Sequence, residues 1–308
     1  MNQPKVIIVV LNYNGKADTL ACLESLSKVR YSNFETVLVD NASQDGSTDA
    51  VRKKFPQVQI IRNRQNLGYA EGNNRGIDWA LKNRADYILI LNNDTTVIKN
   101  FLKELIKVAE KYPKAILFSP QLRYPSVPPR IWYAGGRMFW PIGQLKLYKR
   151  GVLVKKIKNR GPFEVNFVSG AAFFVRAKAF EKLGKFDPKF FLYWEETDWC
   201  ARAQKAHKKF IYVPSSIVYH KEGATTGGPK NAKNYYYFYR NNLLFARKNL
   251  PFYWWPTFLV YLILRIFLIE LPSAWLFLII LKPYRLISFY YIWLGIFDFI
   301  RGKFGRKF

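Results

Sequence analysis

The stretch Tyr87–Thr96, YILILNNDTT, decides the fold class. Five apolar residues in succession, Tyr87 to Leu91, predict a strand that is buried on both faces. The run ends abruptly in the short polar residues Asn-Asn-Asp at positions 92–94. In open α/β sheets, ligands bind at the carboxyl ends of the strands, so this stretch predicts a binding edge. The alternative is a plain turn that caps a helix starting near Ile98.

The same pattern of an apolar run, a polar turn and a helix recurs upstream. We expect strands at 5–11, 34–39, 58–62 and 87–91, with helices at about 17–28, from Ser47 onward, and at about 69–83. This alternation predicts a parallel sheet that is covered by helices on both faces. Because every predicted strand ends in Asn, Asp or Gly, the strand ends together predict a polar cleft.

Three glycines, Gly68, Gly72 and Gly76, follow one another at a spacing of four around the start of the third predicted helix. Gly72 and Gly76 are interpreted as a face that lets this helix pack closely on the sheet. Gly68 lies in the preceding loop, where a positive φ or a close approach to a ligand is expected. Neither a GxGxxG motif nor a GxxxxGK[ST] motif occurs, so the sequence gives no Rossmann or P-loop fingerprint.

The second half of the chain is less regular. Residues 113–168 are rich in Pro and predict hairpins or a mobile loop, and 144–160 contain seven Lys or Arg without an acid. This basic run is either a solvated face or a charge suited to a phosphate-bearing acceptor or a membrane surface. Further strands are predicted at 165–175, 210–213 and 216–219, and a helix at 177–183.

Three carboxylates, Glu195, Glu196 and Asp198, open a predicted helix that runs to about Ala206. Acids in a first turn complement the helix dipole, but three acids after an apolar run exceed what capping requires. On a helix, positions 195 and 198 share a face and 196 points about 100° away, so one or two of the three can face a substrate. His207 is interpreted as the helix end and not as a ligand.

The composition indicates an anionic partner. The 308 residues carry a formal net charge of +28, which suits nucleic acid, a phosphorylated substrate or an acidic membrane. Two cysteines, Cys22 and Cys200, are far apart and predict a reducing cytosol rather than a disulfide framework. The N-terminal apolar run is too short to cross a bilayer, so no signal peptide is expected.

Residues 251–308 are predicted to be a separate helical segment that follows a first domain at 1–250. The stretch 257–281 is long enough to span a bilayer, but it contains Arg265 and Glu270, and each charge costs about 2.5–3.5 kcal/mol at a membrane centre. We expect helices in the interface of the inner leaflet rather than a true span or a packed helical hairpin. The predicted basic anchors are Arg301, Lys303, Arg306 and Lys307.

Six motifs now stand in one order along the chain: VLNYNG at 10–15, VDNAS at 39–43, NLGY at 66–69, LNNDT at 91–95, WEETD at 194–198 and VYH at 218–220. In these motifs the chain resembles the family 2 glycosyltransferases, which have the GT-A fold and invert the anomeric centre. It is most similar to their rhamnosyltransferase-like branch. The resemblance covers about residues 5–245 and implies a GT-A-type, Rossmann-like open α/β sheet with helices on both faces.

The resemblance also implies a function. A sugar would move from a UDP-, dTDP- or GDP-linked donor to a hydroxyl of a glycan or lipid-linked acceptor, in polysaccharide biosynthesis at the cytoplasmic face of the membrane. Donor-binding residues would be Asn12, Asp40, Asn41, Asn66, Gly68, Asn92, Asn93 and Arg240.

The remaining implied roles are the metal site and the base. Asp94 and His220 would hold Mn²⁺ or Mg²⁺. Because the first position of the family's D-x-D signature is Asn92, one expected carboxylate is missing, which implies a weaker or water-mediated metal contact. Glu196 would be the catalytic base, with Glu195 and Asp198 orienting the site or the donor.

Two other functions compete with this interpretation. The net charge of +28 suits a nucleic-acid-binding protein, but no recognisable nucleic-acid-binding module occurs, so no nucleic-acid partner is expected. A processive polysaccharide synthase would need several clear transmembrane helices, whereas this chain has one or two candidates.

Overall fold

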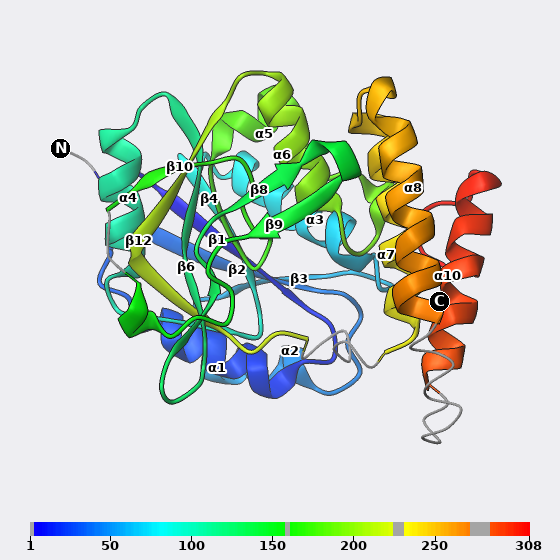
Figure 1. Cartoon of the computed structure of the whole chain (residues 1–308). Coiled ribbons are helices and arrows are strands. Elements are labelled where there is room, and N and C mark those ends of the chain that lie inside the picture. Colours follow the sequence, from blue (N-terminus) through cyan, green and yellow to red (C-terminus); the bar gives the residue numbers. More distant parts are fainter. Residues whose placement is uncertain (1–2, 158–160, 224–230, 272–283) are drawn as a thin grey trace.

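The computed structural model describes residues 3–157, 161–223, 231–271 and 284–308. Its first half alternates strands and helices as predicted: β1 (Val6–Asn12), α1 (Lys16–Leu26), β2 (Phe34–Asp40), α2 (Ser47–Lys54), β3 (Gln59–Arg62), α3 (Gly68–Lys82) and β4 (Tyr87–Asn92). These strands pair in parallel in the order β3-β2-β1-β4. The carboxyl ends of β1, β2 and β4 therefore meet at one edge, as the sequence predicts (Figure 1).

The second half adds strands that make the sheet mixed. These are β5 (Thr95–Val97), β6 (Ala115–Tyr124), β7 (Arg130–Tyr133), β10 (Phe163–Val165), β11 (Ala172–Arg176) and β12 (Lys209–His220). The strand β11 runs antiparallel to both β4 and β6, and β12 runs parallel to β6. The predicted parallel sheet of the first four strands is confirmed, and the strands of the second half extend it into a mixed sheet.

Several predicted boundaries are wrong, because pairing between distant strands is invisible in local sequence. The Pro-rich stretch 113–168 contains the ten-residue strand β6, which lies inside the main sheet. The predicted strand at 165–175 is two strands, β10 and β11, and the two predicted at 210–219 are one irregular strand, β12. Residues 95–97 form β5 against β12, so the next helix begins at Phe101 instead of near Ile98.

The remaining elements lie around this sheet. They are α4 (Phe101–Lys111), the hairpin of β8 (Gly136–Phe139) and β9 (Gln144–Leu147), α5 (Ala177–Leu183), α6 (Glu195–Lys205), α7 (Lys233–Asn249), α8 (Trp255–Arg265), η6 (Ile266–Glu270) and α10 (Tyr284–Ile300), with short 3₁₀ turns η1 (Trp140–Ile142), η2 (Val154–Lys156), η3 (Pro188–Phe190) and η5 (Phe252–Trp254).

The predicted end of the 195–206 helix is confirmed, since His207 has a φ of 54° directly after α6. Cys22 and Cys200 are buried and free.

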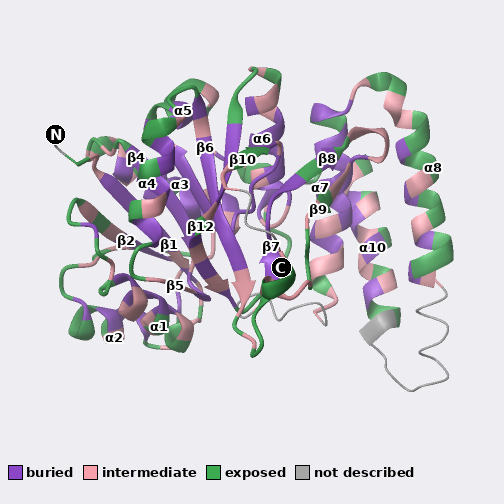
Figure 2. Ribbon diagram, turned by 60° about the vertical axis from the view of Figure 1, so that its left-hand side comes forward, coloured by how far each residue is buried: buried purple, intermediate pink, exposed green. Residues whose placement is uncertain are grey.

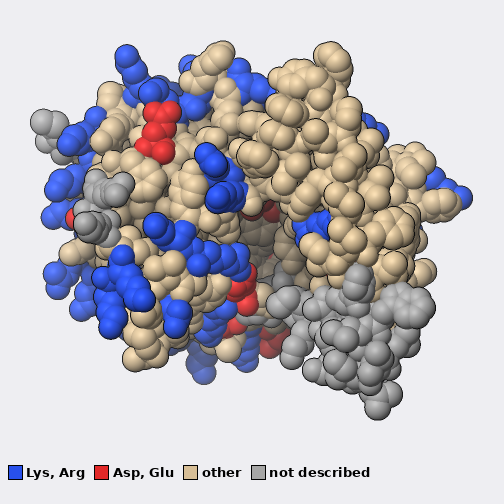
Figure 3. All heavy atoms as spheres, in the orientation of Figure 1, with Lys and Arg blue, Asp and Glu red and all other residues tan. Residues whose placement is uncertain are grey.

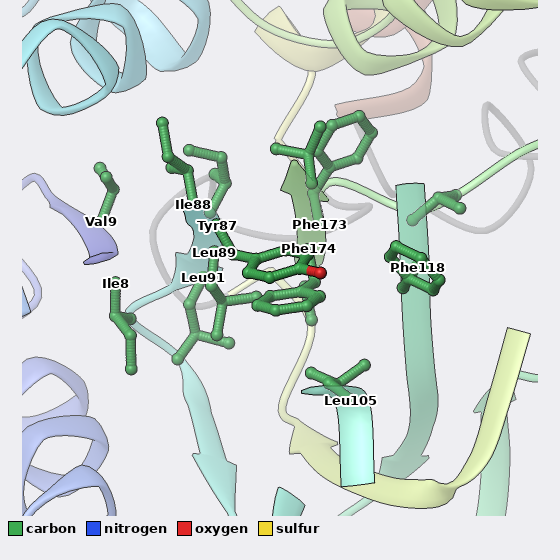
Figure 4. Close-up of a cluster of buried hydrophobic side chains, with 14 of the residues drawn as sticks. Ile8, Val9, Tyr87, Ile88, Leu89, Leu91, Leu105, Phe118, Phe173 and Phe174 are labelled. Atoms are coloured by element: carbon green, nitrogen blue, oxygen red, sulfur yellow. The ribbon is translucent and has the colours of Figure 1, made fainter. Parts of the chain in front are cut away.

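The strand β4 lies at the centre of the hydrophobic core. All of its residues from Tyr87 to Leu91 are at most 2% exposed, and its neighbours are β1 on one side and β11 on the other (Figure 4). The ring of Tyr87 stacks on that of Phe174 at 4.9 Å between centroids. The prediction of a strand buried on both faces is confirmed.

The C-terminal helices α8 and α10 pack on α7 rather than standing apart. Tyr239 and Leu243 of α7, Phe258 and Leu262 of α8, and Ile292 of α10 form one hydrophobic cluster, and the three helices stand side by side next to the sheet (Figures 1 and 2). The domain boundary at residue 250 stays a prediction. Among the described residues, one helical stretch, Phe252–Glu270, is long and apolar enough to cross a membrane. The predicted span 257–281 extends into residues outside the described ranges.

The glycines of α3 act as the sequence predicts. Gly68 has a φ of +74°, and a Cβ at this position would lie 2.4 Å from the carbonyl oxygen of Phe191. Gly76 packs on β1, where an added Cβ would lie 2.2 Å from Cγ1 of Val9. Close contact between helix and sheet therefore excludes any side chain at position 76.

We expect Gly76→Ala to lower the free energy of unfolding by about 1–3 kcal/mol, because overpacking against Val9 outweighs the gain of about 1 kcal/mol in helix propensity. Urea unfolding measures the change. Arg75→Ala, on the exposed side of the same helix, should stay within about 0.5 kcal/mol of wild type. A Gly76→Ala variant as stable as wild type would contradict the close packing.

Candidate active site

A cavity of about 1140 Å³ opens at the carboxyl ends of the parallel strands. Figure 3 shows a hollow in the middle of one face, with acidic side chains in and beside it and basic side chains around it. Its wall combines strand ends of the first half with residues of the C-terminal helices. Of the predicted site residues, the lining includes Asn41, Asn66, Gly68, Asn92, Asn93, Asp94, Glu195, Glu196 and His220.

Asn12 and Asp40 do not line this cavity. They take part in buried hydrogen bonds that hold the strand ends beside it in place. The side-chain amide of Asn12, which is fully buried, lies 2.9 Å from Oδ1 of Asp40 and 2.7 Å from the hydroxyl of Ser47. Its oxygen accepts a hydrogen bond from Thr19 at 2.9 Å, and Asn93 donates to the same Thr19 hydroxyl at 3.0 Å. The ends of β1, β2 and β4 are therefore tied together by buried side chains.

The residues predicted to bind the donor form a second group at the end of β2 and the start of α3. Asn41 donates to the side-chain oxygen of Asn66 at 3.2 Å and to the carbonyl of Gly68 at 3.0 Å. Asn63 in turn donates to Asn41 at 2.8 Å. These contacts fix polar groups on the wall, where a nucleoside could bind.

Asp94 and His220 meet because β5 pairs with the end of β12. Thr95 lies opposite His220 in that ladder, and Nε2 of His220 is 3.2 Å from a carboxylate oxygen of Asp94. Both side chains are almost completely buried, and the ring of Trp132 meets His220 edge-on at 4.6 Å. Asn92 is next to them, with its amide nitrogen 3.5 Å from the same ring nitrogen.

A carboxylate and an imidazole in contact suit Mn²⁺ or Mg²⁺ in part. Within the described ranges, no group of three or more His, Cys, Asp or Glu gathers as a complete protein site. A metal held by Asp94 and His220 therefore takes further ligands from elsewhere, and the oxygens of a diphosphate have the right chemistry. The residues fit such a shared site.

Glu195 and Glu196 enter the cavity from the start of α6. Three non-glycine residues before the helix have positive φ: Phe191 at 62°, Tyr193 at 67° and Trp194 at 76°. Such backbone is unfavourable and persists only when the surroundings hold it. This turn sets where α6 begins, and both Glu195 and Glu196 line the cavity although a regular helix separates neighbouring positions by about 100°.

Residues of α7 hold this strained turn. The side-chain amide of Asn241 lies 2.6 Å from the carbonyl of Phe190, 2.8 Å from that of Leu192 and 3.0 Å from that of Tyr193. Arg240, predicted to lie near the diphosphate, is 1% exposed and does not line the cavity. It donates to the carbonyls of Phe190 and, at 2.7 Å, Gly305.

Asp198 also lies outside the cavity lining. It is fully buried, and Arg202, Lys248 and Asn249 each lie 2.9 Å from its carboxylate. These contacts connect α6 to α7, so the position of Asp198 indicates a brace between helices. Of the three acids, the cavity therefore receives Glu195 and Glu196.

The two cavity acids influence each other's protonation. Burial and the neighbouring charge of Glu196 raise the pKa of Glu195 well above its ordinary value, and burial raises the pKa of Glu196. Hydrogen bonds from the backbone of Gly170 and Thr197 favour the charged form of Glu196. Two buried carboxylates in contact do not ionise together readily, so we interpret Glu195 as the protonated partner and Glu196 as the ionised one.

Several cavity residues were missed by motif analysis. Tyr69 of α3 donates to the carbonyl of Gly170 at 2.7 Å, and burial keeps its pKa well above the ordinary value. Arg150, from the basic run, forms an ion pair with Glu222 and lies over the ring of Trp132. The C-terminal segment contributes Arg265, Glu270, Arg306 and Phe308. Tyr69 stands in the motif at 66–69 but was given no role, the charge of the basic run was the one signal for Arg150, and no local signal places the C-terminal residues in the cavity.

Comparisons with known proteins agree with this geometry. The family model of Glycosyl transferase family 2 matches residues 6–184. The N-acetylglucosaminyl-diphospho-decaprenol L-rhamnosyltransferase of Mycobacterium tuberculosis is 27% identical over 240 residues, 71% of this chain and 77% of that protein. The low-salt glycan biosynthesis hexosyltransferase Agl10 of Haloferax volcanii is 25% identical, over 77% and 74% of the two chains.

Solved structures show the same fold. GalNAc-T7 with UDP, GalNAc and Mn²⁺ matches with a TM-score of 0.57 at 18% identity, over 70% of this chain and 43% of that one. Residues 1–349 of S. aureus TarS in complex with UDP-GlcNAc match with a TM-score of 0.56 at 15% identity, over 78% and 66%. The predicted GT-A fold is confirmed. With a family match over more than half of its length, this chain belongs to glycosyl transferase family 2.

Proposed function

We propose that this enzyme transfers a sugar from a nucleoside-diphosphate donor to a hydroxyl of a lipid-linked acceptor, with inversion of the anomeric centre, at the cytoplasmic face of the membrane. The observation that carries the proposal is that one cavity brings together the buried Glu195–Glu196 pair, the Asp94–His220 pair and the amides of Asn41 and Asn66. A base, a cation site and a nucleoside site are the parts that this reaction needs.

The reaction is a single displacement at the anomeric carbon. The acceptor hydroxyl attacks from the face opposite the leaving diphosphate and loses its proton as the new bond forms, so a base is needed on the acceptor side. Glu196 takes this proton, because the charged form of its carboxylate is favoured while Glu195 holds the shared proton. Burial of the pair keeps water from competing with the acceptor.

Asp94 and His220 would hold a divalent cation against the donor diphosphate. When bound, the cation neutralises the charge that develops on the leaving group. The buried network under the strand ends keeps Asp94 beside His220, and Asn92 lies beside both. The donor-side amides would orient the nucleoside.

The names of relatives support a lipid-linked acceptor. The Mycobacterium tuberculosis relative is named for a diphospho-decaprenol acceptor. In this chain the C-terminal helices present an apolar outer face, with Leu264, Phe267 and Leu268 each at least 49% exposed. Figure 2 shows this face of α8 as exposed. Such a face beside basic residues is typical of proteins that lie on a membrane surface.

The two competing functions have less support. Nucleic-acid binding rests on net charge alone, whereas family membership and the cavity both favour a glycosyltransferase. A processive synthase would need several membrane-spanning helices, and the described residues contain one candidate.

We expect Glu196→Gln to lower kcat by at least about 10²-fold, because the variant keeps the size of the side chain but cannot accept the proton. Donor affinity should stay nearly unchanged. Steady-state kinetics and nucleotide titration measure the two effects, and Glu181→Gln, an exposed change on α5, is the control.

The assignment of Glu196 as the base also predicts how kcat depends on pH. The base works when ionised, and its pKa is raised, so kcat should fall as pH decreases through a value above the ordinary 4.5 of Glu. Glu195→Gln should retain this acid limb. If Glu196→Gln keeps the wild-type kcat while Glu195→Gln is inactive, the base is misassigned.

For the cation site, we expect Asp94→Ala to reduce transfer to background without loss of the fold, because the diphosphate loses its bound counter-charge. Treatment with EDTA should have the same effect, and added Mn²⁺ or Mg²⁺ should restore activity to wild type but not to the variant. Asp49→Ala, an exposed carboxylate on α2, is the control. Full turnover in EDTA would show that the assignment is wrong.

For the membrane surface, we expect the double variant Leu264→Glu and Leu268→Glu to bind anionic vesicles at least about tenfold more weakly, because both apolar side chains would otherwise enter the lipid interface. Co-sedimentation of the full chain measures this. Val127→Glu changes an exposed apolar residue on a loop elsewhere and should bind as wild type does. Equal sedimentation of the double variant would argue against this face as the contact.

A further inference from the structure

We propose that Arg265 binds the phosphate group next to the lipid of the acceptor, at the junction between the cavity and the apolar outer face of α8. The inference rests on the proposed function, since it assigns one end of the acceptor to a defined site. The phosphate site consists of Arg265 with Tyr239, Tyr261 and Gln144 around it.

The first observation is that the charged side chains of the apolar stretch Trp255–Glu270 lie on its cavity side. Between Trp255 and Glu270 the charged residues are Arg265 and Glu270, and both line the cavity. Apart from Thr257 near its start, the exposed side chains of the same stretch are apolar, for example Leu264 at 49% and Leu268 at 67%. In Figure 3 the surface on the side of α8 is mostly made of uncharged residues. One helix therefore presents a lipid-compatible face outward and an ionic group to the cavity.

The second observation is that Arg265 is loosely held. Its contacts within the described ranges are long: 3.3 Å to the hydroxyl of Tyr261, 3.5 Å to Oε1 of Gln144 and 3.7 Å to a carboxylate oxygen of Glu270. The guanidinium also lies over the rings of Phe238 and Tyr239 at 5.2 and 5.5 Å. It also hydrogen-bonds Tyr239. A guanidinium has five N–H donors, so a ligand with closer oxygens can replace these long contacts.

Arg240 shows what a structural arginine of the same region looks like. It donates to Asn241 at 2.9 Å, to the carbonyl of Gly305 at 2.7 Å and to that of Phe190 at 3.1 Å. Its charge is enclosed and its donors are used. Arg265 differs because it is partly exposed to the cavity and has no comparable set of short bonds among the described residues. Its ion pair with Glu270 is long, at 3.7 Å, so an anion with closer contacts would stabilise this partly buried cation further.

The guanidinium of Arg265 is chemically suited to bind a phosphate group. The planar fork of Arg matches two phosphate oxygens at once, and the hydroxyl of Tyr261 beside it can donate to a third. Glu270 holds Arg265 in place when no ligand is bound, and Glu270 itself accepts a hydrogen bond from Tyr239 at 2.8 Å. A phosphate would compete with that carboxylate for the guanidinium.

The position identifies the phosphate as that of the acceptor and not of the donor. The predicted donor groups, Asn41, Asn66 and Asp94, come from strand ends and the loops after them. Arg265, in contrast, is the last residue of α8. An isoprenoid chain on the apolar face of α8 would bring its phosphate to the junction where that face meets the cavity. The sugar attached to this phosphate would then extend into the space that Glu196 lines.

Binding to farnesyl phosphate and to farnesol tests the site. The full chain is titrated with each in nonionic detergent with EDTA, which removes any metal-bound phosphate contact, and tryptophan fluorescence reports binding. We expect wild type to prefer the phosphate by at least about tenfold, the scale of one charge-assisted contact. Arg265→Gln should lose this preference and Arg265→Lys should keep part of it. Arg301→Ala, exposed at the end of α10, should keep all of it.

A second variant distinguishes the loss of the phosphate site from misfolding of the Arg265→Gln protein. Glu270→Gln still accepts the bond from Tyr239 but removes the competing charge, so it should bind farnesyl phosphate more tightly than wild type. Unchanged preference in Arg265→Gln, weaker binding in Glu270→Gln, or equal displacement by inorganic phosphate or phosphatidylglycerol would overturn the inference. Transfer to a lipid-linked sugar is assayed separately: a wild-type protein that shows the preference but transfers no sugar would contradict the proposed function and leave the phosphate site standing.

Discussion

A buried hydrogen-bond network centred on Asn12 is the constraint on which the site depends. A polar group with no exposure must be satisfied within the protein, and the amide of Asn12 is satisfied by side chains from the segments after β1 and β2. Because Asn93 shares Thr19 with it, the end of β4 is fixed to the same network. The neighbouring Asp94 is consequently held at a defined place beside His220. Loss of one member would leave buried partners unsatisfied, which costs about 1–3 kcal/mol for each group.

The other half of the site depends on a strained turn. The residues before Glu195 adopt positive φ, and Asn241 of α7 binds three of the carbonyls around that turn. The same helix packs against α8 and α10, so the helices that carry the apolar face also support Glu195 and Glu196. This arrangement physically connects the proposed membrane surface to the position of the proposed base. Arg240 contributes through Gly305, which belongs to the segment that brings Arg306 to the cavity.

The sequence analysis predicted what depends on local pattern. Buried strands β1 to β4, their helices, the glycine contacts of α3 and the polar strand ends all follow from apolar runs and turn residues. The long strand β6 was missed because prolines mask it and because its burial comes from pairing with β11 and β12. Arg240 was placed at the donor by resemblance, but packing alone decides that its charge is enclosed. The cavity residues of the C-terminal helices carry no local signal, since distant packing brings them there.

The central claim is that one carboxylate in this cavity removes the acceptor proton in a single displacement. The anomeric configuration of the first product formed tests it most directly. A panel of nucleoside-diphosphate sugars is screened by saturation-transfer NMR, the accepted donor is incubated with a lipid-linked acceptor, and the anomeric coupling constant of the product is measured before any isomerisation. The account predicts a product whose anomeric configuration is inverted relative to the donor. A product that retains the donor configuration would contradict it.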